Sequence, residues 1–92
     1  MSQAVQLLSR PTNFAVVQLP DRLHPGVVVQ GDTLNGIVNQ LSRMSELLLT
    51  NQVDELSAEL ADLTETFLDA RRHYESTCGA RGIALPYPKV ST

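Results

Sequence analysis

The chain has 92 residues, of which 42% are hydrophobic and 4% aromatic, and its formal net charge is −3. This length suits one small domain with an aliphatic core, so we expect a single domain over residues 1–92. Apart from Arg71 and Arg72, the basic residues are scattered singly. Without a basic stripe to neutralise phosphates, the chain is not expected to bind nucleic acid.

The cysteine content and the hydropathy predict where in the cell the protein lies. Cys78 is the one cysteine of the sequence, so no internal disulfide can form. The sequence shows neither a signal peptide nor an apolar run long enough to cross a bilayer. These features predict a cytoplasmic protein that does not enter a membrane.

The first third of the chain has the composition of short strands. Residues 4–10 and 14–19 are β-prone, and residues 11–13 between them favour a turn, so we expect a hairpin. Residues 20–26 contain two prolines and a glycine, which predicts a loop. Three valines in residues 27–30 predict a third strand that is covered on at least one face.

From Asp32 onward, apolar residues recur at steps of three and four, which predicts an amphipathic helix over residues 32–50. Asp32 or Thr33 is expected to cap this helix, and Gly31 to free the turn before it. Gly36 is expected to mark a close helix contact. The stripe expected to be buried is Leu34, Ile37, Val38, Leu41, Met44, Leu47 and Leu48.

A second stripe with the same spacing predicts a helix over residues 53–79. Its members are Val53, Leu56, Leu60, Leu63, Phe67, Ala70 and Tyr74. The short polar link between the two helices implies an antiparallel hairpin. Gly79 and Gly82 are expected to end the second helix, and two prolines make residues 83–92 a short extended tail.

This order of elements predicts the fold class. Three strands followed by two helices indicate an α+β fold, with a three-stranded antiparallel sheet in residues 4–30 covered on one face by the helical hairpin.

The corner at residues 31–33 is the first candidate site. A glycine between a strand and a helix N-terminus is a geometry that binds phosphate. The glycine motifs of nucleotide-binding proteins are missing, however, and Asp32 would repel a phosphate. We therefore interpret the corner as the start of a helix.

No catalytic residue, cofactor site or metal site is expected. His24 and His73 lack a second histidine or a cysteine at ligand spacing, and we expect both near the surface. No serine or cysteine lies in a nucleophile motif such as G-x-S-x-G. Cys78, at the end of a helix, is expected to be inert.

The second predicted helix carries a band of carboxylates along one side, relieved only by Arg71 and Arg72. Such a band is either a solvated face or a docking surface for a basic partner. As candidate partner-binding residues we take this band together with three residues of the loop predicted over residues 20–26. They are Glu55, Glu59, Asp62, Glu65 and Asp69 in the helix, and Asp21, Arg22 and His24 in the loop.

The stretch from Phe14 to the first helix is similar to the N-terminal domain of HicB-type antitoxins. In that family an F-x-V-x-x-P-D strand, a P-G turn and a G-D-T-x-x-x-A corner recur in this order, and the corresponding stretches here are FAVVQLPD, with one more residue before the proline, then PG and GDTL. The tail GIALPYP resembles the family's G-x-x-[IL]-P-x-P ending. The matching residues are Phe14, Val16, Pro20, Asp21, Pro25, Gly26, Gly31, Asp32, Thr33, Gly82, Leu85, Pro86 and Pro88.

The chain departs from that pattern in three places. Residues 22–24 lengthen the loop, the second helix is longer than the family's segment, and no residues form a helix-turn-helix or ribbon-helix-helix region for DNA binding. The chain also resembles a group of short, uncharacterised bacterial proteins sharing PTNFAVVQLP, PGVVVQGD and HYE...RGIxLPYP. That second resemblance implies no mechanism.

The HicB-like resemblance implies a module that covers a small toxic partner, as small acidic immunity proteins also do. We therefore expect a bacterial immunity or antitoxin-like protein that neutralises a cognate toxin with a basic surface by direct binding, without catalysis. One alternative is a structural homo-oligomer, in which a second copy completes the seam between the helices. Another is a small enzyme or ligand-binding domain with a deep polar pocket.

Overall fold

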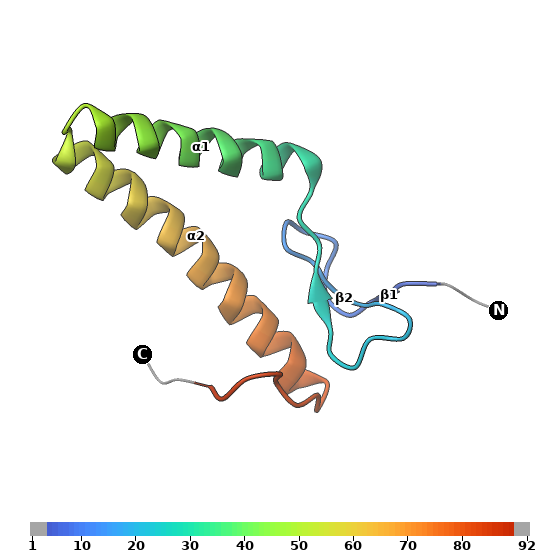
Figure 1. Ribbon diagram of the computed structural model, residues 1–92. Coiled ribbons are helices and arrows are strands. Elements are labelled where there is room, and N and C mark those ends of the chain that lie inside the picture. The colour runs from blue at the N-terminus through green and yellow to red at the C-terminus, as the bar shows by residue number, and fades with distance from the viewer. Residues whose placement is uncertain (1–3, 90–92) are drawn as a thin grey trace. The chain divides into compact units, whose positions relative to one another are not determined.

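The computed structural model describes residues 4–89, which form three strands and two helices (Figure 1). The elements of this part of the chain are β1 (Gln6–Leu7), β2 (Val16–Gln18), β3 (Gly26–Val27), α1 (Gly31–Leu49) and α2 (Val53–Ala80). The expected α+β class, with an antiparallel sheet followed by a two-helix hairpin, is confirmed.

The sheet has the order β1-β2-β3, with β2 antiparallel to both neighbours. Leu7 pairs with Val17 on one side, and Val16 pairs with Val27 on the other. The central strand is the buried one, since Val16 is 0% exposed and Val17 is 6% exposed. The third strand is Gly26–Val27 and not residues 27–30, because β2 begins at Val16 and the pairing ends with the hydrogen bond of 2.8 Å from the Val28 N–H to the Ala15 carbonyl.

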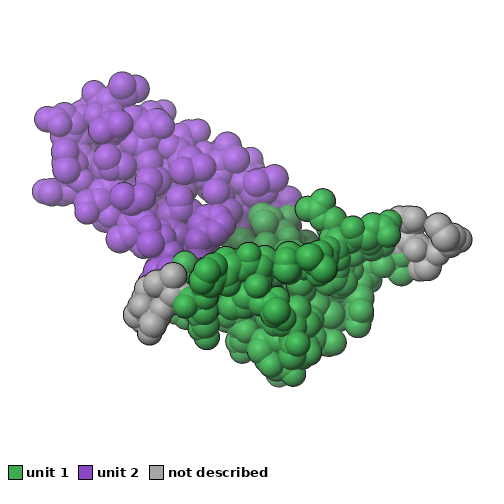
Figure 2. All heavy atoms as spheres, turned by 60° about the horizontal axis from the view of Figure 1, so that its bottom comes forward, with its two compact units in different colours: residues 1–29, 71–92 green, residues 30–70 purple. Residues whose placement is uncertain are grey.

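The chain divides into two compact units, which Figure 2 shows in green and purple. The sheet unit consists of Met1–Val29 and Arg71–Thr92, and the hairpin unit consists of Gln30–Ala70. The helix α2 contributes its first part to the hairpin unit and its last part to the sheet unit.

The core of the sheet unit is formed where β2 meets the last turns of α2. Its buried residues are Leu8, Val16, Tyr74 and Cys78, against which Ile83, Leu85 and Tyr87 pack. The buried Tyr74 hydroxyl donates a hydrogen bond of 2.8 Å to the carbonyl of Pro25. The expected tail thus lies on the core as far as Tyr87, and residues 90–92 lie outside the described part.

Further polar contacts tie the same unit together. The Nε of Arg81 donates to the Leu8 carbonyl at 2.9 Å, which joins the end of α2 to the segment after β1. The Tyr87 hydroxyl donates to the Glu75 carboxylate at 3.1 Å, which holds the tail against α2. Because these bonds join segments far apart in sequence, the sheet unit depends on α2 and the tail as well as on its strands.

The start of α1 differs from the prediction. Gln30 is the N-cap residue, in an extended conformation and without a side-chain cap hydrogen bond, and Gly31 is already helical. Asp32 lies inside the first turn, where its Oδ1 accepts the N–H of Thr33 at 2.8 Å. The N-cap residue is therefore Gln30 and not Asp32 or Thr33, although Asp32 does accept an N–H of the first turn, as expected. Gly31 is also not needed for the turn, since it does not take a left-handed conformation.

Both helices end in the same hydrogen-bond pattern. The residue after each helix cap, Asn51 or Gly82, is left-handed, with φ of 58° and 66° respectively. The N–H of Gln52 then bonds to the Leu47 carbonyl at 2.8 Å, and that of Ile83 bonds to the Cys78 carbonyl at 2.9 Å. This is the Schellman arrangement, which satisfies carbonyls that a helix end leaves unpaired. The expected role of Gly82 is confirmed, whereas Gly79 lies within α2.

The predicted stripes are only partly buried in the hairpin unit. In α1 the one buried residue is Leu47, while Leu34, Leu41 and Leu48 are 53%, 48% and 65% exposed. Gly36 has no atom within 4 Å of the position a Cβ would take, so the expectation that it marks a close contact is wrong.

The two glycines give a matched pair of substitutions. Gly82→Ala is expected to destabilise the protein by about 1 kcal/mol or more, because φ of 66° is strained for any residue with a Cβ. Gly36→Ala is expected to stabilise it by about 1 kcal/mol, because α1 has room for the methyl group and alanine favours the helix. Denaturant unfolding of both variants measures these changes. Equal effects of the same sign would contradict the left-handed conformation of Gly82 and the helical conformation of Gly36.

The two core tyrosines predict how stability depends on alkaline pH. Burial raises the pKa of Tyr74 above 10.0, and burial together with the hydrogen bond to Glu75 raises that of Tyr87. The unfolded chain then loses phenol protons at a lower pH than the folded one does. The two tyrosine phenols therefore contribute fully to stability below pH of about 10, and this contribution is lost as the pH rises through their folded-state pKa values.

Replacing each tyrosine with phenylalanine tests this dependence. Tyr74→Phe is expected to cost about 1–3 kcal/mol at neutral pH, because the buried Pro25 carbonyl loses its donor. Tyr87→Phe is expected to cost less, since its hydrogen bond is only partly buried. Denaturant unfolding from neutral pH to pH of about 11 should show a shallower decline for the double variant than for the wild type. Parallel declines would contradict the role of these phenols.

Candidate functional site

The two units carry opposite net charges. The hairpin unit contains eight carboxylates and one arginine, a formal charge of −7, whereas the sheet unit contains six Lys or Arg and two carboxylates, a charge of +4. Together they account for the net charge of −3. The modest overall charge therefore conceals a strongly acidic helical hairpin.

The five carboxylates expected to bind a partner all lie on α2 within the hairpin unit. At about 100° per residue they occupy one side of the helix. Glu55, Asp62, Glu65 and Asp69 are exposed, and Glu59 is half-buried. The structure thus places the predicted band on a single surface of one unit, which we call the acidic side.

Two residues of α1 hold part of the acidic side in place. The Gln40 amide donates to the Glu59 carbonyl at 3.1 Å and to carboxylate oxygens of Glu59 and Asp62, each at 3.2 Å. The Arg43 guanidinium lies 3.0 Å from Glu59 and 4.0 Å from Glu55. These contacts join the two helices of the hairpin and place one amide and one guanidinium beside the carboxylates.

Sequence reasoning missed Arg43 and Gln40. It assigned relief of the band to Arg71 and Arg72, which follow on the same helix, and did not consider cations from the other helix. Arg43 is the single cation of residues 30–70, and folding the chain back at residues 50–52 brings it opposite Glu55 and Glu59. The antiparallel hairpin, which was predicted, therefore contained the information needed to find this pair.

The three loop residues lie in the sheet unit. Asp21, Arg22 and His24 are all exposed. Asp21 is left-handed, with φ of 63°, and the Arg22 carbonyl accepts a hydrogen bond of 2.6 Å from the Gln18 amide. The loop is thus shaped by its own backbone contacts, and it belongs to a different unit from the acidic side.

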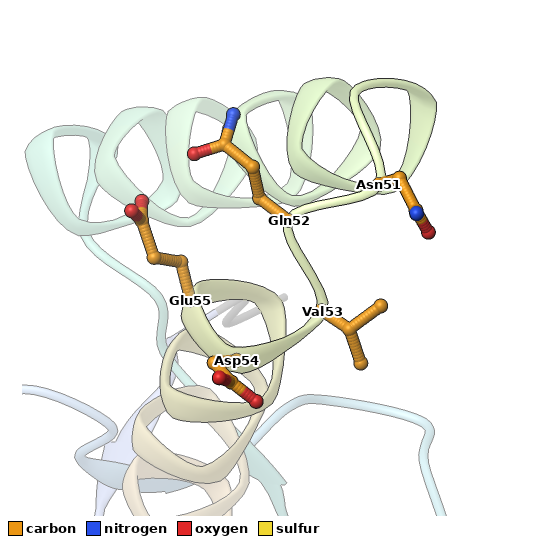
Figure 3. A pocket seen from close by; sticks show the side chains of 5 residues that line it. All are labelled: Asn51, Gln52, Val53, Asp54 and Glu55. Atoms are coloured by element: carbon orange, nitrogen blue, oxygen red, sulfur yellow. The ribbon is translucent and has the colours of Figure 1, made fainter.

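A hollow of about 340 Å³ lies at the turn between the helices. Its lining residues, 51–55, are all exposed, and Figure 3 shows their side chains pointing in different directions. Ligand sites for small molecules are instead enclosed and have polar groups that converge. The hollow therefore does not have the form of a ligand-binding pocket.

Residues 4–89 contain no group of three or more His, Cys, Asp or Glu placed to hold a metal ion. Cys78 is 0% exposed within the core. The Nε2 atom of His73 is buried and has no hydrogen-bond partner in the described part of the chain. In the same range neither helix is long and apolar enough to span a bilayer.

Comparison with known proteins identifies the family. The model of DUF6959, described as a family of unknown function, matches residues 1–87. The chain belongs to this family. No curated protein and no solved structure matches the chain.

Proposed function

We propose that this member of the DUF6959 family is a cytoplasmic bacterial protein that neutralises a toxin protein by binding it, as an immunity protein or an antitoxin-like domain. The observation that supports the proposal best is the charge of −7 on the hairpin unit. The protein acts without catalysis, and its partner presents a basic surface to the acidic side of α2.

The acidic side suits fast and selective binding. A concentrated negative field accelerates encounter with a basic partner and disfavours acidic ones. Because the carboxylates are mostly exposed, their long-range effect falls steeply as salt is added. The partner's basic residues replace water and ions at this surface, and shape complementarity then determines how long the complex lasts.

The contacts from α1 prepare the acidic side for binding. Glu59 and Asp62 share the Gln40 amide, and Glu59 also pairs with Arg43, so these carboxylates keep their positions before a partner arrives. Ordering side chains in advance reduces the entropy lost on binding. We assign Glu65 and Asp69, further along α2, to direct contact with the partner.

The exposed loop of the sheet unit supplies a second contact. Asp21, Arg22 and His24 carry mixed charges on a short segment whose backbone is held by Gln18. Loops positioned by a sheet often contribute to specificity, because their side chains vary without disturbing the core.

Co-expression with the adjacent gene tests the function. The product of that gene should arrest growth of a bacterial host when expressed alone, and growth should recover when this chain is expressed with it. A product that is harmless alone, or one that stays toxic beside this chain, would contradict the proposal. A version of this chain with Val16→Asp, which disrupts the buried core, serves as the control that should not protect.

Charge removal tests the surface. With the purified product of the adjacent gene, Glu65→Gln with Asp69→Asn should slow association several-fold at low salt and have little effect at high salt. Thr12→Lys with Asn13→Lys is the matched control, because it makes the same change in net charge on an exposed turn of the sheet unit. If both variants slow association equally, net charge and not the acidic side is responsible.

A further inference from the structure

The hairpin unit has a second surface that the proposed function does not use. On each helix, a row of aliphatic side chains lies exposed on the side away from the carboxylates. We call these rows the uncharged face, and its main residues are Leu34, Val38, Leu41 and Leu48 of α1 with Val53 and Leu60 of α2. Each of the six is between 48% and 65% exposed.

The rows of both helices lie on the same side of the hairpin. Around the axis of α1, Gln40 lies on the side that bonds to α2, the half-buried Ile37 lies next to it, and the exposed Leu41 lies beyond Ile37. Around the axis of α2, the same direction of rotation passes from Glu59 to Leu56 and then to Leu60. Because the helices are antiparallel, the same rotation along the chain is clockwise in one helix and anticlockwise in the other when both are viewed from one end. The two helices face each other, so these rotations bring Leu41 and Leu60 to the same side of the hairpin.

The spacing of the exposed residues is that of a helical bundle. Leu34, Leu41 and Leu48 follow one another at steps of seven, as do Val53 and Leu60 in α2. The half-buried Ile37 and Met44, and likewise Leu56 and Leu63, fall three residues after members of these rows. Such paired positions form the seam of helices that pack side by side in a bundle. In the hairpin only half of each seam is covered.

The uncharged face is large enough to be an interaction surface. Its six main side chains, each between 48% and 65% exposed, together present on the order of several hundred Å² of aliphatic surface. Contiguous apolar patches that exceed a few hundred Å² mark interaction sites on soluble proteins.

The charge pattern selects the occupant of the face. No Asp, Glu, Lys or Arg lies in either row, although the hairpin unit carries a charge of −7. A basic partner gains nothing at this face, because the carboxylates that attract it lie on the other side. An identical uncharged face is compatible with itself, and a two-fold axis lets each row meet its counterpart.

We propose that a second copy of this chain binds the uncharged face, so that two hairpins form a four-helix bundle. The acidic sides then point outward from the dimer, separated by about two helix diameters, roughly 20 Å. This separation exceeds the Debye length at physiological salt, about 8 Å, so repulsion between them is largely screened. Each acidic side stays accessible to a basic partner.

The molar mass in solution tests this dimer. Light scattering of the full chain at micromolar concentration should give twice the chain mass of 10.1 kDa. Leu41→Glu with Leu60→Glu should yield a monomer, because burying the new carboxylates is unfavourable. Asn39→Glu with Ala58→Glu, which adds the same charge at exposed positions on the opposite side of the same helices, should remain a dimer. A monomeric wild type, or a dimer that survives the first pair of substitutions, would overturn the proposal.

Cross-linking gives a second measurement that needs no disruptive change. Ser45→Cys and Ser57→Cys place a thiol among the exposed rows, and Asn39→Cys places one on the opposite side. Oxidation should produce covalent dimers with at least one of the first two variants and not with the third, while the buried Cys78 stays unreactive. Equal cross-linking of all three, or none, would contradict the interface. Neither experiment involves a toxin, so the dimer and the proposed function can fail independently.

Discussion

The sheet unit depends on the packing of α2 against its strands, and the buried hydrogen bond from the Tyr74 hydroxyl to the carbonyl of Pro25 is part of this contact. The three strands are too short to close a core alone. The last turns of α2 supply what is missing, since Tyr74 and Cys78 pack against Leu8 and Val16. Because the phenol is buried, its hydroxyl requires an acceptor, and the Pro25 carbonyl provides one. This requirement couples a loop near the start of the chain to a helix near its end.

The helix α2 therefore has two roles. Its last part completes the core of the sheet unit, and its first part forms the hairpin unit with α1. The hairpin has little buried apolar surface, with Leu47 as the single buried residue of α1. Polar contacts from Gln40 and Arg43 hold one of its sides, and the other side presents aliphatic residues to solvent. The two sides of the hairpin differ in chemistry, and we assign them different partners.

Local patterns predicted the elements well. The helix boundaries agree within one residue, because the three-four spacing and the turn at residues 50–52 are properties of short segments. The left-handed conformation of Gly82 followed from the residue type in the same way. The predicted strand runs were too long, since strand pairing depends on neighbours distant in sequence and only β2 has a partner on each side. The prediction of Asp32 as the N-cap was wrong, because a helix can begin at any of several neighbouring residues and residue type alone does not select one of them.

For the candidate site, helical periodicity alone places the carboxylates of α2 on one side of a helix, so this arrangement follows from the sequence. The sequence also shows which residues are apolar in each stripe. The packing of the two helices was needed to find that Arg43 and Gln40 contact this side and that about half of each apolar stripe is left exposed. The physical reason is that a period identifies a face, whereas burial depends on what packs against it. In the hairpin unit a single neighbouring helix covers only half of each stripe.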